Sequence, residues 1–373
     1  MDEFSPKALQ LAREERGLSQ SALADAMRFS QGLVSQIENG LMKPSEEFIK
    51  KVVEVLRYPR SFFAEPPPYR ALPVITFRKQ KTLSATTLKA IQARLSIRTA
   101  ELMRLLKSVD VPENRLPRIA IERRPPSNRP TPSPEEVAQE LRLRWHVEPG
   151  PVANIIQLVE DAGVLVCRAN FGTPKMSGMS DYNPAEARTQ RVQKDEMPPV
   201  LPPIIYLNAE MLADRARYTV AHELGHLVFH HHLPLPPDQD LCEEEADRFA
   251  AEFLMPADEI AGDLERLSLE KLYSLKRYWK VSMHALIHRA EDLEVITPSR
   301  ARSLYIELAK NGFKMGEPQL FEHEAPSLVT EITQFHLSDL GYSEEQLGEA
   351  LRLLPWELRE IYLGGERRLR VVS

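Results

Sequence analysis

Two histidines and a glutamate within five residues carry the clearest chemical signal of this sequence. His222 and His226 flank Glu223 in the pentapeptide HELGH, inside an amphipathic stretch, residues 213–232, that predicts a helix. On a helix, residues four apart lie one turn above the other, so both imidazoles face one ion. Glu223 would lie beside that ion and take a proton from water. We interpret the motif as a zinc site with Glu223 as its catalytic base.

Zinc needs a third protein ligand, and histidine or cysteine could supply it. His230 lies eight residues beyond His222, about 12 Å along a helix, which is too far for one ion. His232 occupies the last position of a longer histidine pattern, but Phe229 replaces the glycine with which that pattern turns the chain. His232 and Cys242 therefore stay open as less favoured alternatives.

The acidic run at residues 243–245 offers the preferred third ligand. Glu243 shares one predicted helix face with small alanines that allow this helix to approach the first one closely. The residues of that face are Glu243, Ala246, Asp247 and Ala250. We interpret Glu244 and Glu245 as acids that favour a helix N-terminus, and we expect Glu243 to reach the ion.

Strands and further helices must position these residues. Residues 163–167 and 203–208 predict strands, and the polar stretch between them, residues 169–202, has no predicted element. The HELGH helix ends before Pro234, because the residue that precedes a proline avoids the helical region. A second helix, residues 242–255, carries the acidic run, and the chain is again helical from residue 268 onward.

The N-terminal third has a different organisation. Residues 1–60 predict four short helices, and a long helix is expected from about Ser84 to Val109. Seven prolines between Pro112 and Pro134 predict a semi-rigid linker, which we take as the main domain boundary.

Charge is distributed unevenly along the chain. The net charge of −6 over 373 residues combines a neutral stretch (1–60), a basic one with fourteen basic and four acidic residues (70–134), and an acidic remainder. Two cysteines exclude a disulfide framework. A run of about 18 apolar residues is absent, so we expect no membrane span and a cytoplasmic protein.

The two helix motifs resemble the ImmA/IrrE family of gluzincin-type metallopeptidases. The matching stretches are RYTVAHELGH and EEEADRFAAEFLMP, and the likeness extends over roughly residues 134–295. It implies a zinc cofactor, His222, His226 and Glu243 as ligands, Glu223 as the catalytic residue, and a helical subdomain after the catalytic helices. In that subdomain we interpret His284 and His288 as helix-packing residues.

The N-terminal helices resemble the helix-turn-helix domain of the XRE family. The likeness makes residues 31–40 the recognition helix, whose N-terminal end enters the major groove of double-stranded operator DNA. It implies base contacts from Gln20, Gln31, Gly32, Ser35 and Gln36, and phosphate contacts from Asn39 and Lys43. A glutamine amide suits adenine. The alternative is a small protein-binding helical bundle, which the neutral charge would permit.

The basic stretch has two open interpretations. It could neutralise DNA phosphates, or it could dock on the acidic part of the same chain. The residues concerned are Arg78, Lys79, Lys81, Arg94, Arg98 and Arg104.

We therefore expect a multidomain protein with an all-α helix-turn-helix domain, an α+β gluzincin-like metallopeptidase domain and a helical C-terminal region. The expected boundaries are 1–65 for DNA binding, 66–133 for a basic helical connector and proline-rich linker, 134–265 for the peptidase, 266–296 for its helical subdomain, and 297–373 for the C-terminal region. Two roles are open for this last region: it covers the cleft, or it forms a homodimer.

The expected function is a DNA-binding transcriptional regulator that hydrolyses a peptide bond in a partner repressor or in itself. One alternative is a regulator whose zinc domain is a silent sensor or dimerisation unit. The intact Glu223 disfavours it, because a silent site would tolerate loss of the base. A repressor or antitoxin of a two-gene module is a further alternative that the sequence does not separate from the first.

Overall fold

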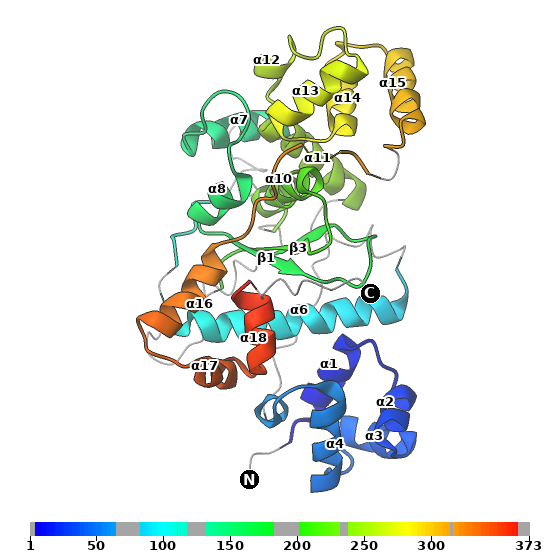
Figure 1. The fold of residues 1–373 in the computed structure, drawn as a ribbon, viewed down its shortest axis with the longest axis vertical. Coiled ribbons are helices and arrows are strands. Elements are labelled where there is room, and N and C mark those ends of the chain that lie inside the picture. Colours follow the sequence, from blue (N-terminus) through cyan, green and yellow to red (C-terminus); the bar gives the residue numbers. More distant parts are fainter. Residues whose placement is uncertain are drawn as a thin grey trace, which may run out of the picture.

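The computed structural model describes residues 4–64, 83–109, 111–117, 132–182, 201–231, 238–313, 316–318 and 320–364. Four helices and a short 3-10 helix form the N-terminal domain (Figure 1). They are α1 (Pro6–Glu15), α2 (Gln20–Met27), α3 (Gln31–Glu38), α4 (Glu46–Leu56) and η1 (Arg60–Phe63). A serine hydroxyl caps the N-terminus of each α-helix, from Ser5, Ser19, Ser30 and Ser45, which satisfies a backbone amide that the helix itself leaves free.

A small mixed sheet lies at the centre of the second unit. Its strands are β1 (Leu165–Ala169), β2 (Gly178–Asp181) and β3 (Ile204–Asn208), in the order β1-β3-β2. β1 runs parallel to β3, with Leu165 opposite Ile204, and β2 runs antiparallel to β3, with Ser180 opposite Ile205. In the described sheet β2 is therefore an edge strand.

Four helices cover one side of this sheet: α7 (Pro134–Arg144), α8 (Ile155–Asp161), α10 (Ala213–Phe229) and α11 (Gln239–Leu254). α10 packs on β2 and β3, and α11 packs on α10 and α7. The two long helices approach very closely at Gly225, where an added Cβ would lie 3.1 Å from Ala246 Cα and 3.2 Å from the Phe249 ring. Small residues at this crossing thus bring the acidic run next to the histidines.

The other side of the sheet is covered by α6 (Ala85–Leu105), which continues into the short η3 (Leu106–Ser108), and by three C-terminal helices. These are α16 (Leu328–Ser338), α17 (Glu344–Leu351) and α18 (Pro355–Tyr362). Ile91 and Leu102 of α6 share one apolar core with Tyr206 of β3 and Leu358 of α18. α1 of the N-terminal domain also packs on α6. The long helix is thus the common support of three parts of the molecule.

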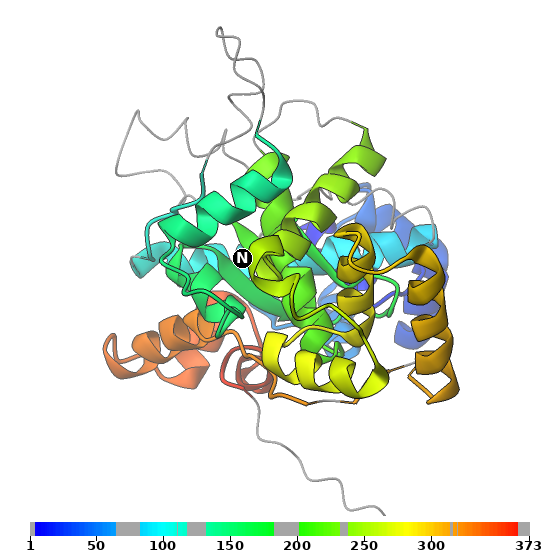
Figure 2. The same cartoon turned by 90° about the horizontal axis from the view of Figure 1, so that it is seen from above.

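A helical subdomain follows α11 and consists of α12 (Ala257–Ile260), α13 (Leu269–Trp279), α14 (Met283–Asp292) and α15 (Pro298–Lys310). It shares one apolar core with α7, α8, α10 and α11. From above, α15 and α16 lie on opposite sides of the molecule (Figure 2). The connection between them, which includes residues 316–318 and 320–327, crosses the unit that contains the sheet.

The expected multidomain layout is confirmed, with a helical N-terminal domain, a small sheet flanked by helices and a helical C-terminal region. One detail differs from the expected boundaries. α15 packs on α13 and α14, whereas α16 packs on β1, so residues 297–373 do not form one unit. Over the described stretches, every helix is too short or too polar to cross a membrane.

Candidate metal centre

The HELGH histidines and the first glutamate of the acidic run converge between α10 and α11. One ligand atom from each of His222, His226 and Glu243 lies within 4.8 Å of the other two. The two Nε2 atoms are 3.1 Å apart, and the Glu243 carboxylate oxygens lie 3.7 Å from His222 Nε2 and 3.6 Å from His226 Nε2. Within the described part of the chain this is the one group of three such residues that could hold a metal ion.

The chemistry of this donor set fits zinc, which accepts two imidazoles and a carboxylate. All three side chains are buried, and burial lowers the pKa of His226 to about 4. That imidazole is therefore neutral near pH 7, the form that binds a metal. Of the other candidates, Cys242 is buried but lies outside the group, and His232 lies outside the described residues.

The two histidines are oriented by different acceptors. His222 donates from Nδ1 to Asp247 Oδ1 at 2.8 Å. His226 Nδ1 lies 2.9 Å from Nδ1 of the buried His230, whose Nε2 lies 3.0 Å from Glu245 Oε2. Because a carboxylate only accepts, His230 donates to Glu245 and accepts from His226. Both ligand Nε2 atoms then present a lone pair to the same point.

Sequence reasoning missed this outer layer. From the sequence, His230 is a candidate ligand that lies too far from His222, and Glu245 is typical of an acid at a helix N-terminus. The signal that could have found them is the spacing itself: His230 lies four residues after His226, on the same helix face.

Glu223 lies beside the centre and points toward the edge strand. It is 2% exposed, and Ser180 Oγ on β2 donates to Glu223 Oε2 at 2.9 Å. His231 Nε2 lies 3.2 Å from the same hydroxyl, and its Nδ1 donates to the Tyr182 carbonyl at 3.1 Å. Burial lowers the pKa of His231 to about 3, so this imidazole is neutral and competes with Glu223 for the hydroxyl proton.

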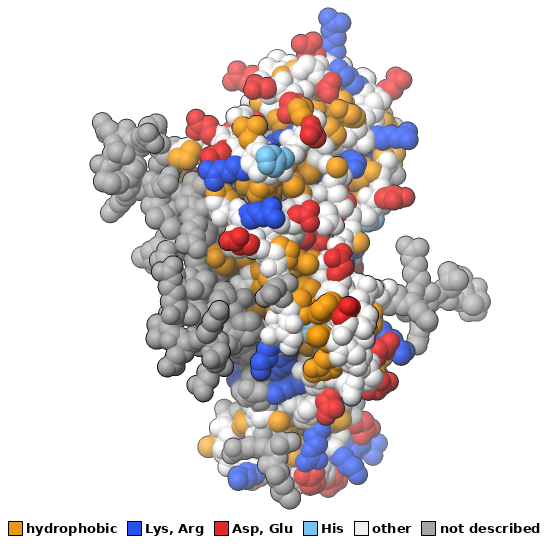
Figure 3. All heavy atoms as spheres, turned by 90° about the vertical axis from the view of Figure 1, so that its left-hand side faces the viewer, with side chains coloured by type: hydrophobic (Ala, Val, Ile, Leu, Met, Phe, Trp, Pro, Cys, Tyr) orange, Lys and Arg blue, Asp and Glu red, His pale blue; other side chains and the backbone are white. Residues whose placement is uncertain are grey.

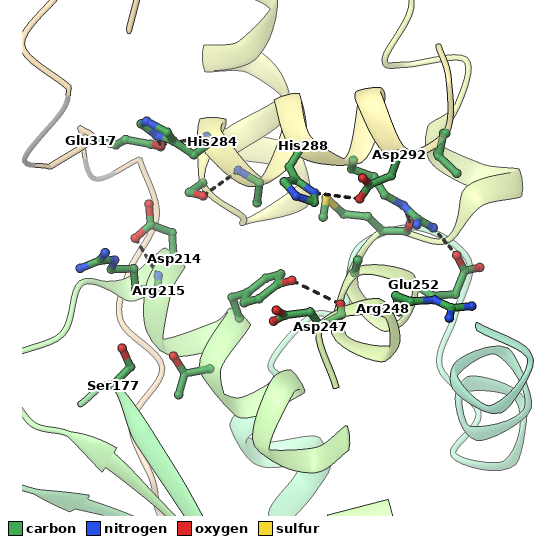
Figure 4. Close-up of a pocket in the computed structure, with 18 of the residues that line it drawn as sticks. Ser177, Asp214, Arg215, Asp247, Arg248, Glu252, His284, His288, Asp292 and Glu317 are labelled. Atoms are coloured by element: carbon green, nitrogen blue, oxygen red, sulfur yellow. Dashed lines mark hydrogen bonds and ion pairs between the residues drawn. The ribbon is translucent and has the colours of Figure 1, made fainter. Parts of the chain in front are cut away.

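A cavity of about 1460 Å³ lies between α10, α11 and α14, and its lining does not include His222, Glu223, His226 or Glu243. Asp247, the partner of His222, is part of its lining, and Ser177 lies at the end near β2 (Figure 4). His284 and His288 also line it, with side chains 45% and 71% exposed, and they bond to Glu317 and Asp292. Our interpretation as packing residues is therefore wrong for His288, whereas His284 stacks on Tyr305 of α15 with ring centroids 5.7 Å apart.

The residues expected to contact DNA lie on and near α3. Gln31, Gly32, Gln36, Asn39 and Lys43 are exposed, and Gln20 and Ser35 are half-buried. Gln20 accepts from the Gln31 amide at 3.1 Å and donates to Glu38 at 2.8 Å, so two of the expected base contacts are linked. Leu23 and Ile37 are buried in the core of this domain.

Three described arginines of the basic stretch make contacts inside the protein. Arg94 donates to Glu15 Oε1 at 2.9 Å, Arg98 donates to Glu101 at 2.7 Å, and Arg104 NH1 lies 3.5 Å from the Leu351 carbonyl oxygen. These contacts favour docking over phosphate binding for these three arginines. Arg78, Lys79 and Lys81 lie outside the described residues. On the face shown in Figure 3, acidic and basic side chains are interspersed.

Comparison with protein families gives one match for the N-terminal helices and one for the unit that carries the metal centre. Residues 9–63 match the helix-turn-helix family model, and residues 159–291 match the model of the IrrE N-terminal-like domain. A search of curated proteins finds no match. The chain therefore joins an XRE-type helix-turn-helix domain to a metallopeptidase domain of the IrrE/ImmA-like family.

Proposed function

We propose that the protein is a DNA-binding regulator that hydrolyses a peptide bond at a zinc centre formed by His222, His226 and Glu243. The convergence of these three donors beside a buried glutamate supports the proposal most directly. The operator-binding half rests on the exposed α3 and on the helix-turn-helix match.

The residues around the centre have distinct tasks. Zinc, when bound, supplies a Lewis acid that polarises a carbonyl and acidifies water. Glu223 takes a proton from the attacking water and delivers it to the leaving amine. Ser180 holds one oxygen of this carboxylate, so that its other oxygen stays directed at the reacting groups.

Replacement of Glu223 separates catalysis from metal binding. We expect Glu223→Gln to bind zinc as the parent does and to lose peptide hydrolysis, because an amide cannot accept the proton. The measurement is metal content by mass spectrometry together with cleavage of a denatured protein substrate. Asp258→Asn, an exposed residue of α12 outside the cavity lining, is the matched control. Full cleavage by Glu223→Gln would refute the assignment.

The DNA-binding half needs its own test. Selection from a random pool of duplexes with the full chain identifies the operator sequence. We expect Gln36→Ala to relax the preference at one base pair, because one bidentate contact discriminates by about 1–3 kcal/mol. Gln334→Ala, an exposed glutamine on α16, is the control. Failure of the full chain to enrich any sequence would contradict operator binding.

The substrate is a partner repressor or the chain itself. Self-cleavage in the stretch 112–134 would have to release the N-terminal domain in order to act as a switch. The packing of α1 on α6, and of α6 on the sheet, opposes such release. This arrangement favours a partner protein as the substrate.

A further inference from the structure

We propose that the N-terminal end of α6 contacts the DNA backbone, so that the DNA-binding surface extends beyond the helix-turn-helix domain. Lys89 binds a phosphate there, in a groove that this end of α6 forms with the start of α2. The inference rests on the proposed DNA binding and adds to it a contact from another part of the chain.

A groove of about 400 Å³ lies between the N-terminal domain and α6. Gln20 and Asn39 line it from the N-terminal domain, and Thr86 and Lys89 line it from α6. Gln31, the first residue of α3, donates from its side-chain amide to Gln20 at 3.1 Å. The groove therefore begins next to the N-terminal end of the recognition helix.

The path of the DNA backbone follows from the helix-turn-helix geometry. The recognition helix, here α3, lies in the major groove, and the first helix of the motif, here α2, crosses the backbone. Gln20 is the first residue of α2 and belongs to the lining of the groove. The groove thus lies beside the path of the backbone, where a cation meets a phosphate.

One face of α6 carries Lys89 toward this groove. On that face, Ala93 and Ile97 belong to the apolar core of the N-terminal domain. Lys89 precedes Ala93 by four residues and Thr86 precedes it by seven, so both lie on the same face, about one and two turns nearer the start of the helix. The face that packs on the N-terminal domain thus continues into the groove as polar and basic residues.

Lys89 is the cation of the groove that faces solvent. Arg13, which also lines the groove, lies 2.6 Å from Glu38 and 3.8 Å from Glu14. The side chains of these two glutamates are only 4% and 11% exposed, so they present little charge to a ligand. Lys89 is exposed and forms no ion pair with the residues that the structure describes.

The two interpretations of the basic stretch thus apply to different parts of α6. Arg94, Arg98 and Arg104 contact the protein itself, whereas Lys89 stays available for DNA. Arg94 also fixes the helix on the N-terminal domain, because it donates to Glu15 Oε1 at 2.9 Å and to the Glu15 carbonyl at 3.0 Å. Lys89 therefore reaches a phosphate from a helix that is already in place, and binding orders no further segment.

The salt dependence of DNA binding by the full chain tests this contact. Fluorescence anisotropy measures binding to a labelled duplex selected with the parent protein and to a duplex of shuffled sequence. We expect Lys89→Ala to bind both about fivefold more weakly at about 50 mM salt, and its plot of log K against log salt concentration to be less steep by about 0.9, because one phosphate contact is lost. Lys89→Arg should keep the parent slope. Unchanged affinity and slope in Lys89→Ala would overturn the inference.

The opposite end of the same helical segment offers a matched control. Lys107 is an exposed lysine of η3 that lies outside the groove lining. Lys107→Ala makes the same change of charge and should bind both duplexes as the parent does. An equal loss in the two lysine variants would show a general charge effect and refute the site.

Neutral methylphosphonate groups, placed at single positions of the selected duplex, locate the phosphate. We expect one position at which this substitution weakens binding by the parent but has no further effect on Lys89→Ala, because both changes remove the same contact. If every position weakens the parent and the variant by equal factors, Lys89 contacts no phosphate of this duplex.

The two proposals fail in different ways. Selection of a sequence by the parent, with an unchanged salt slope in Lys89→Ala, would count against the α6 contact alone. Weaker binding of the shuffled duplex by Lys89→Ala, without selection of any sequence by the parent, would count against operator recognition alone. A parent protein that binds no duplex would overturn both.

Discussion

Each histidine of the proposed metal centre keeps its proton on Nδ1 because a carboxylate accepts it, directly or through a second ring. Asp247 accepts from His222, whereas Glu245 acts on His226 through His230. A fixed Nδ1 proton leaves Nε2 free for the ion and limits rotation of the ring. Glu245 orients the His226 ring through two successive hydrogen bonds, by way of His230. His226 and His230 are buried, and Glu245 is half-buried.

Removal of the charge at Glu245 tests this connection. We expect Glu245→Gln to weaken zinc binding by about tenfold, and His230→Gln by about tenfold to a hundredfold, because outer-layer partners of ligating histidines contribute such factors. Competition with a chelator measures the affinity, and the visible spectrum of the cobalt form reports the ligand field independently of activity.

Two comparisons make that prediction specific. Glu244→Gln removes the same charge one residue earlier on an exposed face and should leave the affinity unchanged. His230→Asn places an oxygen where Nδ1 stood, so it should retain more zinc than His230→Gln. If Glu245→Gln binds zinc as tightly as Glu244→Gln, then Glu245 has no part in orienting His226.

At the scale of elements, the helices that carry the metal ligands were predictable and the strand beside them was not. The spacing of His222, His226 and Glu243 follows from helical periodicity, and their convergence follows from small residues at the crossing. β2 has four residues, of the sequence GMSD, with no alternation of polar and apolar side chains. Its place is set by pairing with β3, which lies far along the chain, so Ser180 was missed.

The helix α6 was predicted as a helix, but its environment was not. Its arginines allow two interpretations, phosphate binding or docking on the acidic part of the same chain, and the local sequence does not reveal their partners. Those partners, Glu15 and Asn170 for Arg94 and Tyr362 for Arg98, come from distant segments. Ion pairing within the fold and exposure to DNA produce the same sequence pattern.

Carboxylates at helix N-termini fasten the C-terminal region to the peptidase unit. Glu324 accepts from the Ile155 amide at 2.9 Å at the start of α8, and Glu160 at the end of α8 accepts from the Ser327 amide at 3.1 Å. Burial raises the pKa of Glu160 to about 7 from 4.5. The folded protein therefore keeps this proton over a pH range in which the unfolded chain has lost it.

This difference predicts that stability falls as the pH rises from about 4.5 to about 7. The folded state binds more protons there, so the free energy of unfolding decreases with pH, by about 2–3 kcal/mol from this group. We expect Glu160→Gln to lack this part of the decrease, because an amide does not titrate in this range. The amide carbonyl can still accept the hydrogen bond from Ser327. Urea unfolding between pH 4.5 and pH 8 measures it, with exposed Asp161→Asn as the control. An unchanged decrease in Glu160→Gln would contradict the prediction.

At the scale of the whole molecule, the N-terminal domain is attached to the body by more than the chain. Arg94 of α6 bonds to Glu15, and Arg16 contacts Glu357 of α18 at 3.2 Å. Ala93 and Ile97 of α6 also belong to the apolar core of the helix-turn-helix domain. Some of the charged residues of the chain thus form ion pairs between its domains.

These contacts predict that a cut in the chain does not free the DNA-binding domain. α6 precedes the proline-rich stretch, so release would have to expose Ile91, Leu102 and Leu105, which are at most 1% exposed. Burying three such side chains contributes about 1.5–3 kcal/mol each. A specific protease site placed between residues 118 and 131, outside the described residues, should therefore yield two fragments that elute together in gel filtration and bind DNA as the intact chain does.

Substitution within this core supplies the contrast for that prediction. The double variant Ile91→Asp with Leu102→Asp places two unpaired charges against the sheet. The free-energy cost of burying these charges exceeds the gain from burying the apolar surface of α6. After the same cut, we expect the N-terminal fragment of this variant to elute alone, while its helix-turn-helix domain keeps its fold by circular dichroism. Separate elution of the fragments without these substitutions would show that cleavage in this stretch alone is a release mechanism.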